Sequence, residues 1–332
     1  MKLSELSIHP SAGAQVSVAA PGRLHLGFLD PDGTLGRPFG SLGLTIDGPC
    51  TRAALRLAQR DSIEADPGAE SEIGRARSHI AALKRLFRRD APLALRLREV
   101  LPPHAGLGSG TQLALALGRA FASLHGIEVA TAELARSLGR GKRSGIGVAA
   151  FDRGGFLLDG GPGKDTPAPL LARVDFPEAW RVLLVLDPRG AGLHGDDEGH
   201  ALGRLEPLPR TSAAHLAHVT LLQILPALHE ADFAPFARGI TEIQRVIGAH
   251  FAPAQRGSAY TSADVAQVVE WLGANFDAAI GQSSWGPTGF AIFPSQGDAD
   301  RAVDRARAAG QIAAPLALRV VKGRNHGALL SD

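Results

Sequence analysis

The centre of the chain reads Leu101-Pro-Pro-His-Ala-Gly-Leu-Gly-Ser-Gly-Thr-Gln112. Ahead of it, leucines at 93, 95 and 97 alternate with less apolar residues, which is the period of a half-buried strand. Behind it, apolar residues recur at three- and four-residue steps from Leu113 to Leu124 and predict a helix. A glycine-rich turn that enters a helix presents unpaired backbone N–H groups at the positive end of the helix dipole. The sequence therefore predicts a phosphate-binding loop, built from Gly106, Leu107, Gly108, Ser109, Gly110 and Thr111.

The same loop has a plainer interpretation, in which its glycines only permit a tight strand–turn–helix joint. It differs from the P-loop pattern, and it follows its strand too loosely for a dinucleotide fingerprint. A second glycine-rich segment, Gly139-Arg-Gly-Lys-Arg-Ser-Gly-Ile-Gly147, places Arg140, Lys142 and Arg143 beside backbone donors. It is either a second anion site or a basic surface turn.

The composition describes an ordinary globular protein. Of its 332 residues, 45% are hydrophobic and 20% are charged, which allows a large core and two domains. A net charge of +2 with few aromatic residues argues against a nucleic-acid partner. The single cysteine excludes an internal disulfide and fits a reducing compartment. Because we find neither a secretory leader nor an apolar run of membrane length, we expect a cytoplasmic protein with no membrane partner.

Hydrophobic periodicity predicts alternating strands and helices along the chain. In the first half we expect strands over 15–19, 23–29, 42–46 and 52–57, a helix over 71–88, and a helix from Thr131, as its cap, to residue 138. Residues 148–151 and 155–158 look like a pair of strands. In the second half we expect strands over 180–187, 290–293 and 316–321 and helices over 211–231, 233–251, 262–273 and 298–309. This order, with antiparallel neighbours, predicts an α+β fold.

Two further segments carry polar side chains. Arg23 and His25 share one face of a predicted strand, opposite Leu24 and Leu26, and are candidates to meet a ligand. Residues 192–200 hold two histidines, two aspartates and a glutamate, which invites a metal interpretation. No ligand spacing there identifies a metal, and surface loops are commonly acidic. The metal ligands, if any, are therefore not named by the sequence.

Three spaced motifs resemble those of the GHMP kinase superfamily, in order and spacing, over nearly the whole chain. They are Pro21-Gly-Arg-Leu-His-Leu-Gly27, Pro103-His-Ala-Gly-Leu-Gly-Ser-Gly110 and Gly281-Gln-Ser-Ser-Trp-Gly-Pro-Thr-Gly289. The resemblance implies a two-domain α+β fold, each domain a mainly antiparallel sheet packed with helices. It places the active site in the cleft between the domains, which we expect at residues 1–165 and 166–332.

The chain departs from the kinase pattern at one decisive position. GHMP kinases usually carry a catalytic aspartate in a serine–glycine segment after the central helix. Here that segment is Ser144-Gly-Ile-Gly147, and Gly147 has no side chain to deprotonate an acceptor hydroxyl. An ATP-dependent small-molecule kinase is therefore the alternative, and a non-catalytic ligand-binding relative is a third hypothesis.

A closer resemblance is to a non-kinase branch, the β-ribofuranosylaminobenzene 5′-phosphate synthases. It is carried by residues 23–30, 139–147, 151–161 and 281–288. The resemblance implies that phosphoribosyl pyrophosphate condenses with 4-aminobenzoate or 4-hydroxybenzoate, releasing carbon dioxide and pyrophosphate, in tetrahydromethanopterin biosynthesis. It further implies Mg²⁺, no organic cofactor and a homodimer.

The implied chemistry suggests roles for particular side chains. Lys142 and Arg143 would neutralise the leaving pyrophosphate, and Asp30 would stabilise the cationic sugar, unless it only shapes a turn. Arg37, with Arg23 as a competitor, would orient the aromatic carboxylate through its planar guanidinium. Trp285 would stack on the ring, unless it belongs to the core. The remaining expected substrate contacts are His25, Ser144, Ser283, Ser284 and Thr288.

Overall fold

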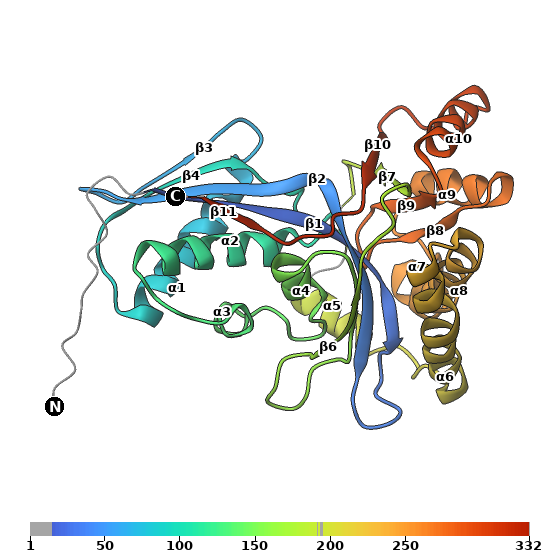
Figure 1. The fold of residues 1–332 in the computed structure, drawn as a ribbon, viewed down its shortest axis with the longest axis horizontal. Coiled ribbons are helices and arrows are strands. Elements are labelled where there is room, and N and C mark those ends of the chain that lie inside the picture. The colour runs from blue at the N-terminus through green and yellow to red at the C-terminus, as the bar shows by residue number, and fades with distance from the viewer. Residues whose placement is uncertain (1–14, 191, 193–194, 332) are drawn as a thin grey trace.

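The computed structural model describes residues 15–190, 192 and 195–331, and for residues 195–198 it describes the backbone alone. Two β-sheets organise this part of the chain (Figure 1). Helices α1 to α3 lie along one face of the larger sheet, and α6 to α10 gather around the smaller one. This arrangement agrees with the two-domain α+β fold expected from the motifs.

The larger sheet has seven strands within the described residues. Its order is β11-β1-β2-β4-β3, and β5 and β6 continue from the first half of β2. All pairs are antiparallel except β3 with β4. The strands are β1 (Gln15–Asp30), β2 (Phe39–Leu57), β3 (Ser62–Ala65), β4 (Leu93–Glu99), β5 (Phe156–Asp159), β6 (Leu170–Val174) and β11 (Leu329–Ser331).

Helix α2 is the buried helix of this half. It begins directly after Gly108, whose φ of 85° is the left-handed conformation that glycine adopts without strain. Its apolar stripe, which includes Leu113, Leu117 and Phe121, is buried against the sheet and α1. The helices of this half are α1 (Ile73–Phe87), α2 (Ser109–Leu124), α3 (Thr131–Ser137) and α4 (Ile146–Asp152).

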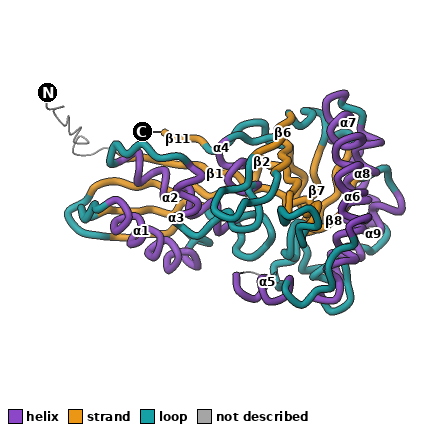
Figure 2. Tube along the Cα trace, turned by 90° about the horizontal axis from the view of Figure 1, so that it is seen from below, coloured by secondary structure: helices purple, strands orange, loops and turns teal. Residues whose placement is uncertain are grey.

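The smaller sheet has the order β10-β7-β9-β8, and Figure 2 shows α6 to α9 beside it. One face of β7 and β9 packs against α8, and the other packs against α9 and α10. Its strands are β7 (Arg181–Leu186), β8 (Ala279–Gln282), β9 (Gly289–Phe293) and β10 (Ala317–Lys322). Its helices are α5 (Gly195–Leu202), α6 (Arg210–Val219), α7 (Leu225–Glu230), α8 (Phe233–Phe251), α9 (Ala263–Asn275) and α10 (Gln296–Ala308), with a π-helical turn at 220–224 joining α6 to α7. Among the described helices, none combines the length and apolar character needed to cross a bilayer.

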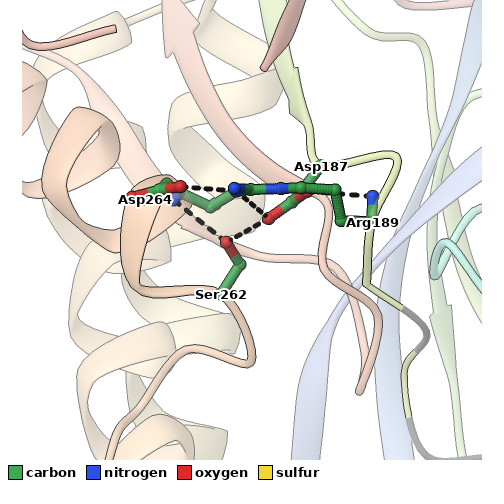
Figure 3. Close-up of polar contacts among 5 residues, drawn as sticks. Asp187, Arg189, Ser262 and Asp264 are labelled. Atoms are coloured by element: carbon green, nitrogen blue, oxygen red, sulfur yellow. Dashed lines mark hydrogen bonds and ion pairs between the residues drawn. The ribbon is translucent and has the colours of Figure 1, made fainter. Parts of the chain in front are cut away.

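A polar network fastens the end of β7 to the start of α9 (Figure 3). Arg189 donates to both carboxylate oxygens of Asp187 at 2.9 Å and also reaches Asp264. Ser262, which caps α9, donates to Asp187 at 2.7 Å. The bonds from Arg189, and then from Ser262, lower the pKa of Asp187 to about 2. This tie holds the segment that leads from β7 towards Gly192.

Two local predictions are wrong. Residues 148–151 belong to helix α4 rather than to a strand, because a short apolar run does not distinguish the two structures by its period. Thr131 is the first residue of α3 rather than its cap. Its hydroxyl instead accepts from Arg119 and donates to Asp152, and so ties α3 to α2 and α4.

The domain boundary at residue 165 stays a prediction. It falls between β5 and β6, which are hydrogen-bonded neighbours in the larger sheet. The last strand, β11, also returns to that sheet beside β1. The larger sheet therefore contains strands from both parts of the sequence.

The central loop and the third motif meet at a seam between the halves. The Ser283 hydroxyl donates to the carbonyl of Gly106 at 2.8 Å, and Arg23 donates to the same oxygen. A Cβ at Gly286 would lie 2.3 Å from the backbone nitrogen of Gly106, so only glycine fits there. The amide of Gly192 donates to the carbonyl of His104 at 3.0 Å, which adds a third segment to the seam.

Gly106→Ala should cost much more stability than Gly126→Ala. Both glycines have positive φ, 86° and 63°. A Cβ at Gly106 would lie 2.3 Å from the Ser283 carbonyl oxygen, whereas none lies within 4 Å at Gly126. We expect a loss of about 1 kcal/mol at Gly126 from backbone strain and about 3 kcal/mol or more at Gly106. Urea unfolding measures both, and equal losses would contradict the tight seam.

Candidate functional site

The predicted phosphate loop forms the start of α2 as a rigid turn. The carbonyl of Gly108 accepts from the amides of Thr111 and Gln112, both at 3.0 Å. The backbone amide of Arg23 donates to the carbonyl of Leu107 at 3.1 Å, and its side chain packs over Gly108. The amides of Ser109 and Gly110 precede the first of these helical bonds and carry partial positive charge. The loop therefore presents fixed donors for an anion.

Two further arginines converge on this turn. A Cβ at Gly110 would lie 3.1 Å from Nη1 of Arg140 and 3.2 Å from Nη1 of Arg75. Arg75 comes from α1 and donates to the buried carboxylate of Glu72 at 2.6 Å. Sequence reasoning missed Arg75, because nothing in the helical pattern of α1 indicates that it faces α2.

The positive charge at this turn exceeds the negative charge around it. Burial lowers the pKa of Arg140, and the charge of Arg75 lowers it further. Burial together with these two arginines lowers the pKa of His79 to about 4. The Nε atom of Arg140 is buried and has no hydrogen-bond partner among the described residues. Like charges held together in a partly buried place favour a bound anion, which would relieve their repulsion.

Arg140→Gln should weaken pyrophosphate binding without lowering thermal stability. A charge-assisted hydrogen bond contributes about 1.5–3 kcal/mol, so we expect the Kd of pyrophosphate to rise by about 10- to 100-fold. The matched control is Arg85→Gln, an exposed arginine on α1. Calorimetric titration with pyrophosphate and a thermal melt check both variants. An unchanged Kd, or equal losses in both variants, would contradict an anion site at this turn.

In the second basic segment, Arg140 lies at the central loop, whereas Lys142, Arg143 and Ser144 have other surroundings. Lys142 is exposed and lines a cavity of about 630 Å³ on the outer side of α4, which it shares with Arg140, Arg136, Arg153 and Lys164. The guanidinium of Arg143 approaches Gly199. The Ser144 hydroxyl donates to Asp159 at 2.9 Å, and it accepts from the amide of Ile146 at the start of α4.

A side chain at Gly147, where the kinase pattern has its aspartate, would crowd Thr111. A Cβ there would lie 3.0 Å from Cγ2 of Thr111, and the three nearest atoms all belong to that threonine. The side chain of Gln112 donates to the Gly147 carbonyl at 2.8 Å, which holds α4 tightly against α2. Thr111 therefore faces α4 beside Gly147.

The third motif has mixed surroundings. Ser283 is fully buried and bonds to Gly106 and to the amide of His25, so its hydroxyl is used within the seam. Thr288 is also fully buried, with a hydroxyl that has no partner in the described chain. The amide of Ser284 donates to the His25 carbonyl at 3.1 Å. Trp285 is buried and stacks on Phe251 with 4.4 Å between ring centroids, so one of its faces is already covered.

His25 is buried beside a small cavity of about 20 Å³, which Ser284 and Trp285 also line. Its Nε2 atom has no hydrogen-bond partner among the described residues. Burial, and next the charge of Arg23, lowers the pKa of His25 to about 3. The imidazole is therefore neutral at physiological pH and acts as a neutral hydrogen-bonding group.

Acidification should destabilise the fold through His25. The imidazole takes up a proton near pH 6.5 in the unfolded chain but stays neutral to about pH 3 in the folded protein. The contribution of His25 to the free energy of unfolding is therefore fully present above pH 6.5 and is lost as the pH falls below 6.5. Between pH 6.5 and 4 it amounts to about 3 kcal/mol. Urea unfolding across this range should show a steeper loss for the wild type than for His25→Gln. Parallel curves for the two proteins would contradict the lowered pKa.

Asp30 and Arg37 lie on the turn between β1 and β2. The carboxylate of Asp30 accepts from the amides of Gly33 and Thr34 at 3.0 and 2.7 Å and from the Thr34 hydroxyl at 2.8 Å. Arg37 is exposed and donates to the carbonyl of Gly161 at 3.0 Å. Asp30 is thus held within its own turn, whereas Arg37 reaches the segment after β5.

Few side chains that could bind a metal lie close together in the described part of the chain. Among the described residues, no group of three or more His, Cys, Asp or Glu side chains gathers as a metal site. Most of the acidic segment at 192–200 lies outside this description, since residues 193–194 and the side chains of 195–198 are not part of it. Near the central loop, Glu72 has one carboxylate oxygen on Arg75 and one buried oxygen without a partner.

Comparison with known proteins agrees with this geometry. Residues 76–155 match the family described as GHMP kinases N terminal domain, and residues 224–312 match GHMP kinases C terminal. The chain is similar to the beta-ribofuranosylphenol 5′-phosphate synthase of Archaeoglobus fulgidus, with 34% identity over 290 residues, which cover 83% of this chain and 87% of that protein. The protein of the same name from Methanothermobacter thermautotrophicus is 30% identical over 334 residues, or 95% and 98% of the two chains. The crystal structure of homoserine kinase from Cytophaga hutchinsonii covers 99% of this chain and 100% of its own with a TM-score of 0.62, and at 18% identity it shows the fold alone.

Proposed function

The chain belongs to the beta-ribofuranosylphenol 5′-phosphate synthase family and has the GHMP kinase fold, and we propose that it is a decarboxylating phosphoribosyl transferase. As a member of this family it is an enzyme of the pentosyltransferase type. In the proposed reaction, phosphoribosyl pyrophosphate condenses with 4-hydroxybenzoate or 4-aminobenzoate. The products are a C-riboside 5′-phosphate for tetrahydromethanopterin biosynthesis, pyrophosphate and carbon dioxide.

The proposed reaction balances without a redox partner or an organic cofactor. The bond from the sugar C1 to the diphosphate breaks, and its electron pair leaves on pyrophosphate. The ring carbon that bears the carboxylate supplies the pair for the new carbon–carbon bond to C1. The carboxylate then leaves as carbon dioxide, and the pair it leaves behind restores the aromatic ring.

The observation that carries the proposal is the excess of positive charge at the start of α2. Arg140, Arg75 and the first-turn amides surround Gly110, and Arg23 packs over Gly108. A leaving diphosphate gains negative charge as its bond to C1 breaks, and preorganised donors stabilise that charge in the transition state. Arg143 and Lys142 lie further out, so we assign the main stabilisation to Arg140 and Arg75.

The surroundings of Gly147 favour this reaction over phosphoryl transfer. A kinase needs a group that orients or deprotonates the acceptor hydroxyl. Gly147 has no side chain here, and the nearest side chain, that of Thr111, is not basic. The proposed transferase needs no base at this place, because the aromatic ring itself is the nucleophile.

Strand β1 offers places for the sugar and the arene. Arg23, His25 and Asp30 follow one another along it, from the phosphate loop to the turn. We propose that the Asp30 carboxylate stabilises the cationic sugar and that Arg37 orients the aromatic carboxylate. The bonds that Asp30 accepts within its turn also suit a structural role, and the two roles are separated by the experiment below.

Mg²⁺ fits the residues as a counterion of the substrate. Mg²⁺ typically keeps several waters and binds through one or two carboxylates together with phosphate oxygens. Glu72, with its unpartnered buried oxygen beside Arg75, would hold the ion, and the hydroxyls of Ser109 and Thr111 lie at the same end of α2. When bound, Mg²⁺ would neutralise part of the diphosphate charge.

The direct test is release of labelled carbon dioxide. Purified protein with Mg²⁺ should release it from carboxyl-labelled 4-hydroxybenzoate or 4-aminobenzoate only when phosphoribosyl pyrophosphate is present. Asp30→Asn keeps an acceptor oxygen for the turn and removes the charge, so turnover should fall about 100-fold with a small change in Tm. Asp90→Asn is the matched control, an exposed aspartate outside the turn.

The alternatives give different products. Acceptor-dependent ADP formation would identify a kinase, and saturable binding of phosphoribosyl pyrophosphate without turnover would identify a non-catalytic relative. Either result, with no carbon dioxide from any para-substituted benzoate, would end the proposal. Equal losses of stability and turnover in Asp30→Asn would assign that residue to the turn alone.

A further inference from the structure

The small cavity beside His25 has walls suited to one end of an aromatic ring. It lies between β1 and α8, next to the third motif, and its volume of about 20 Å³ admits one water-sized group. Phe28, Phe251 and Trp285 line it. The ring of Phe28 meets that of His25 edge-on, with 4.7 Å between centroids.

Two buried ring nitrogens at this cavity are unsatisfied. His25 is 4% exposed and Trp285 is 2% exposed. Neither Nε2 of His25 nor Nε1 of Trp285 has a hydrogen-bond partner among the described residues. A buried polar atom without a partner costs about 1–3 kcal/mol, so a pair of them at one cavity indicates a missing polar group.

The three glutamines of the wall are hydrogen-bonded within the protein. Gln244 donates to the Leu26 carbonyl at 2.7 Å and accepts from the Gln282 amide at 2.8 Å. Gln255 accepts from the Gln282 side chain at 2.9 Å. The glutamines are thus occupied, which leaves the two unpartnered ring nitrogens, together with the Ser284 hydroxyl, to bind a group that enters the cavity.

The occupant should be uncharged. His25 is neutral, and the other side chains that line the cavity in the described chain carry no charge. A carboxylate placed there would lack a direct counterion. Of the two ends of a para-substituted benzoate, the hydroxyl or amino end therefore fits, and the carboxylate end does not.

The position of His25 agrees with the phosphate site. The backbone of His25 is fixed by two hydrogen bonds. Its amide donates to the Ser283 hydroxyl at 3.0 Å, and its carbonyl accepts from the amide of Ser284. Arg23 lies two residues earlier on the same strand and packs over Gly108. The cavity and the phosphate loop therefore lie at the two ends of one short segment of β1.

Building on the transferase activity proposed above, we propose that His25 and Trp285 bind the para substituent of the aromatic acid and select oxygen over nitrogen there. The indole N–H is a donor only, so it needs an acceptor. A phenol oxygen accepts that bond, and it can either donate to or accept from Nε2 of His25. The nitrogen of an aniline is a poor acceptor, because its lone pair is delocalised into the ring, and it leaves the Trp285 donor unsatisfied.

The test compares three acids, 4-hydroxybenzoate, 4-aminobenzoate and benzoate, by calorimetric binding and by kcat/KM with phosphoribosyl pyrophosphate. For the wild-type protein, both the affinity and kcat/KM should be about tenfold or more higher for 4-hydroxybenzoate than for 4-aminobenzoate. Trp285→Phe keeps an aromatic ring against Phe251 and removes the N–H. It should reduce this preference to about twofold or less with a small change in Tm. Trp271→Phe, a tryptophan of the separate α9 core, is the control and should keep the full preference.

His25→Phe provides a second variant, expected to weaken binding of both para-substituted acids and to leave benzoate binding unchanged. A preference that persists unchanged in Trp285→Phe would overturn the inference and leave the cavity to a water molecule. That result differs from failure of the proposed function, in which wild-type protein would release no carbon dioxide from any of the three acids.

Discussion

The carbonyl oxygen of Gly106 is the point on which the site depends. It accepts hydrogen bonds from Arg23 of β1 and from Ser283 of the third motif, so one atom joins the first, second and third motifs. The contact is possible because glycines at 106 and 286 let two backbones approach without side chains between them. The phosphate loop is consequently fixed before any ligand arrives, and preorganised donors need no reorganisation when charge develops.

The side chains around β1 change from charged to aromatic and uncharged along the strand. At the loop, arginines from α1, β1 and the segment before α4 gather with one buried carboxylate, Glu72. A few residues further on, the walls are aromatic and uncharged around a neutral His25. This order suits a substrate pair whose charged diphosphate and aromatic ring must meet at one carbon.

The sequence predicted the parts that depend on local pattern. The glycine-rich entry to α2 and the helices α8, α9 and α10 follow from spacing and propensity within a few residues. What it missed depends on contacts between distant segments. Arg75 reaches Gly110 only because α1 packs beside α2, and Ser283 proved to be a seam residue because β8 ends beside β1. The short helix α4 was taken for a strand, since seven residues are too few to establish a period.

A crystal structure with phosphoribosyl pyrophosphate bound tests the central claim most directly. We expect the diphosphate to bind the amides of Ser109 and Gly110, within hydrogen-bonding distance of Arg140. We expect the sugar C1 to lie on the side of His25. It would be contradicted by a diphosphate bound in the larger basic cavity on the outer side of α4, with the start of α2 left without an anion.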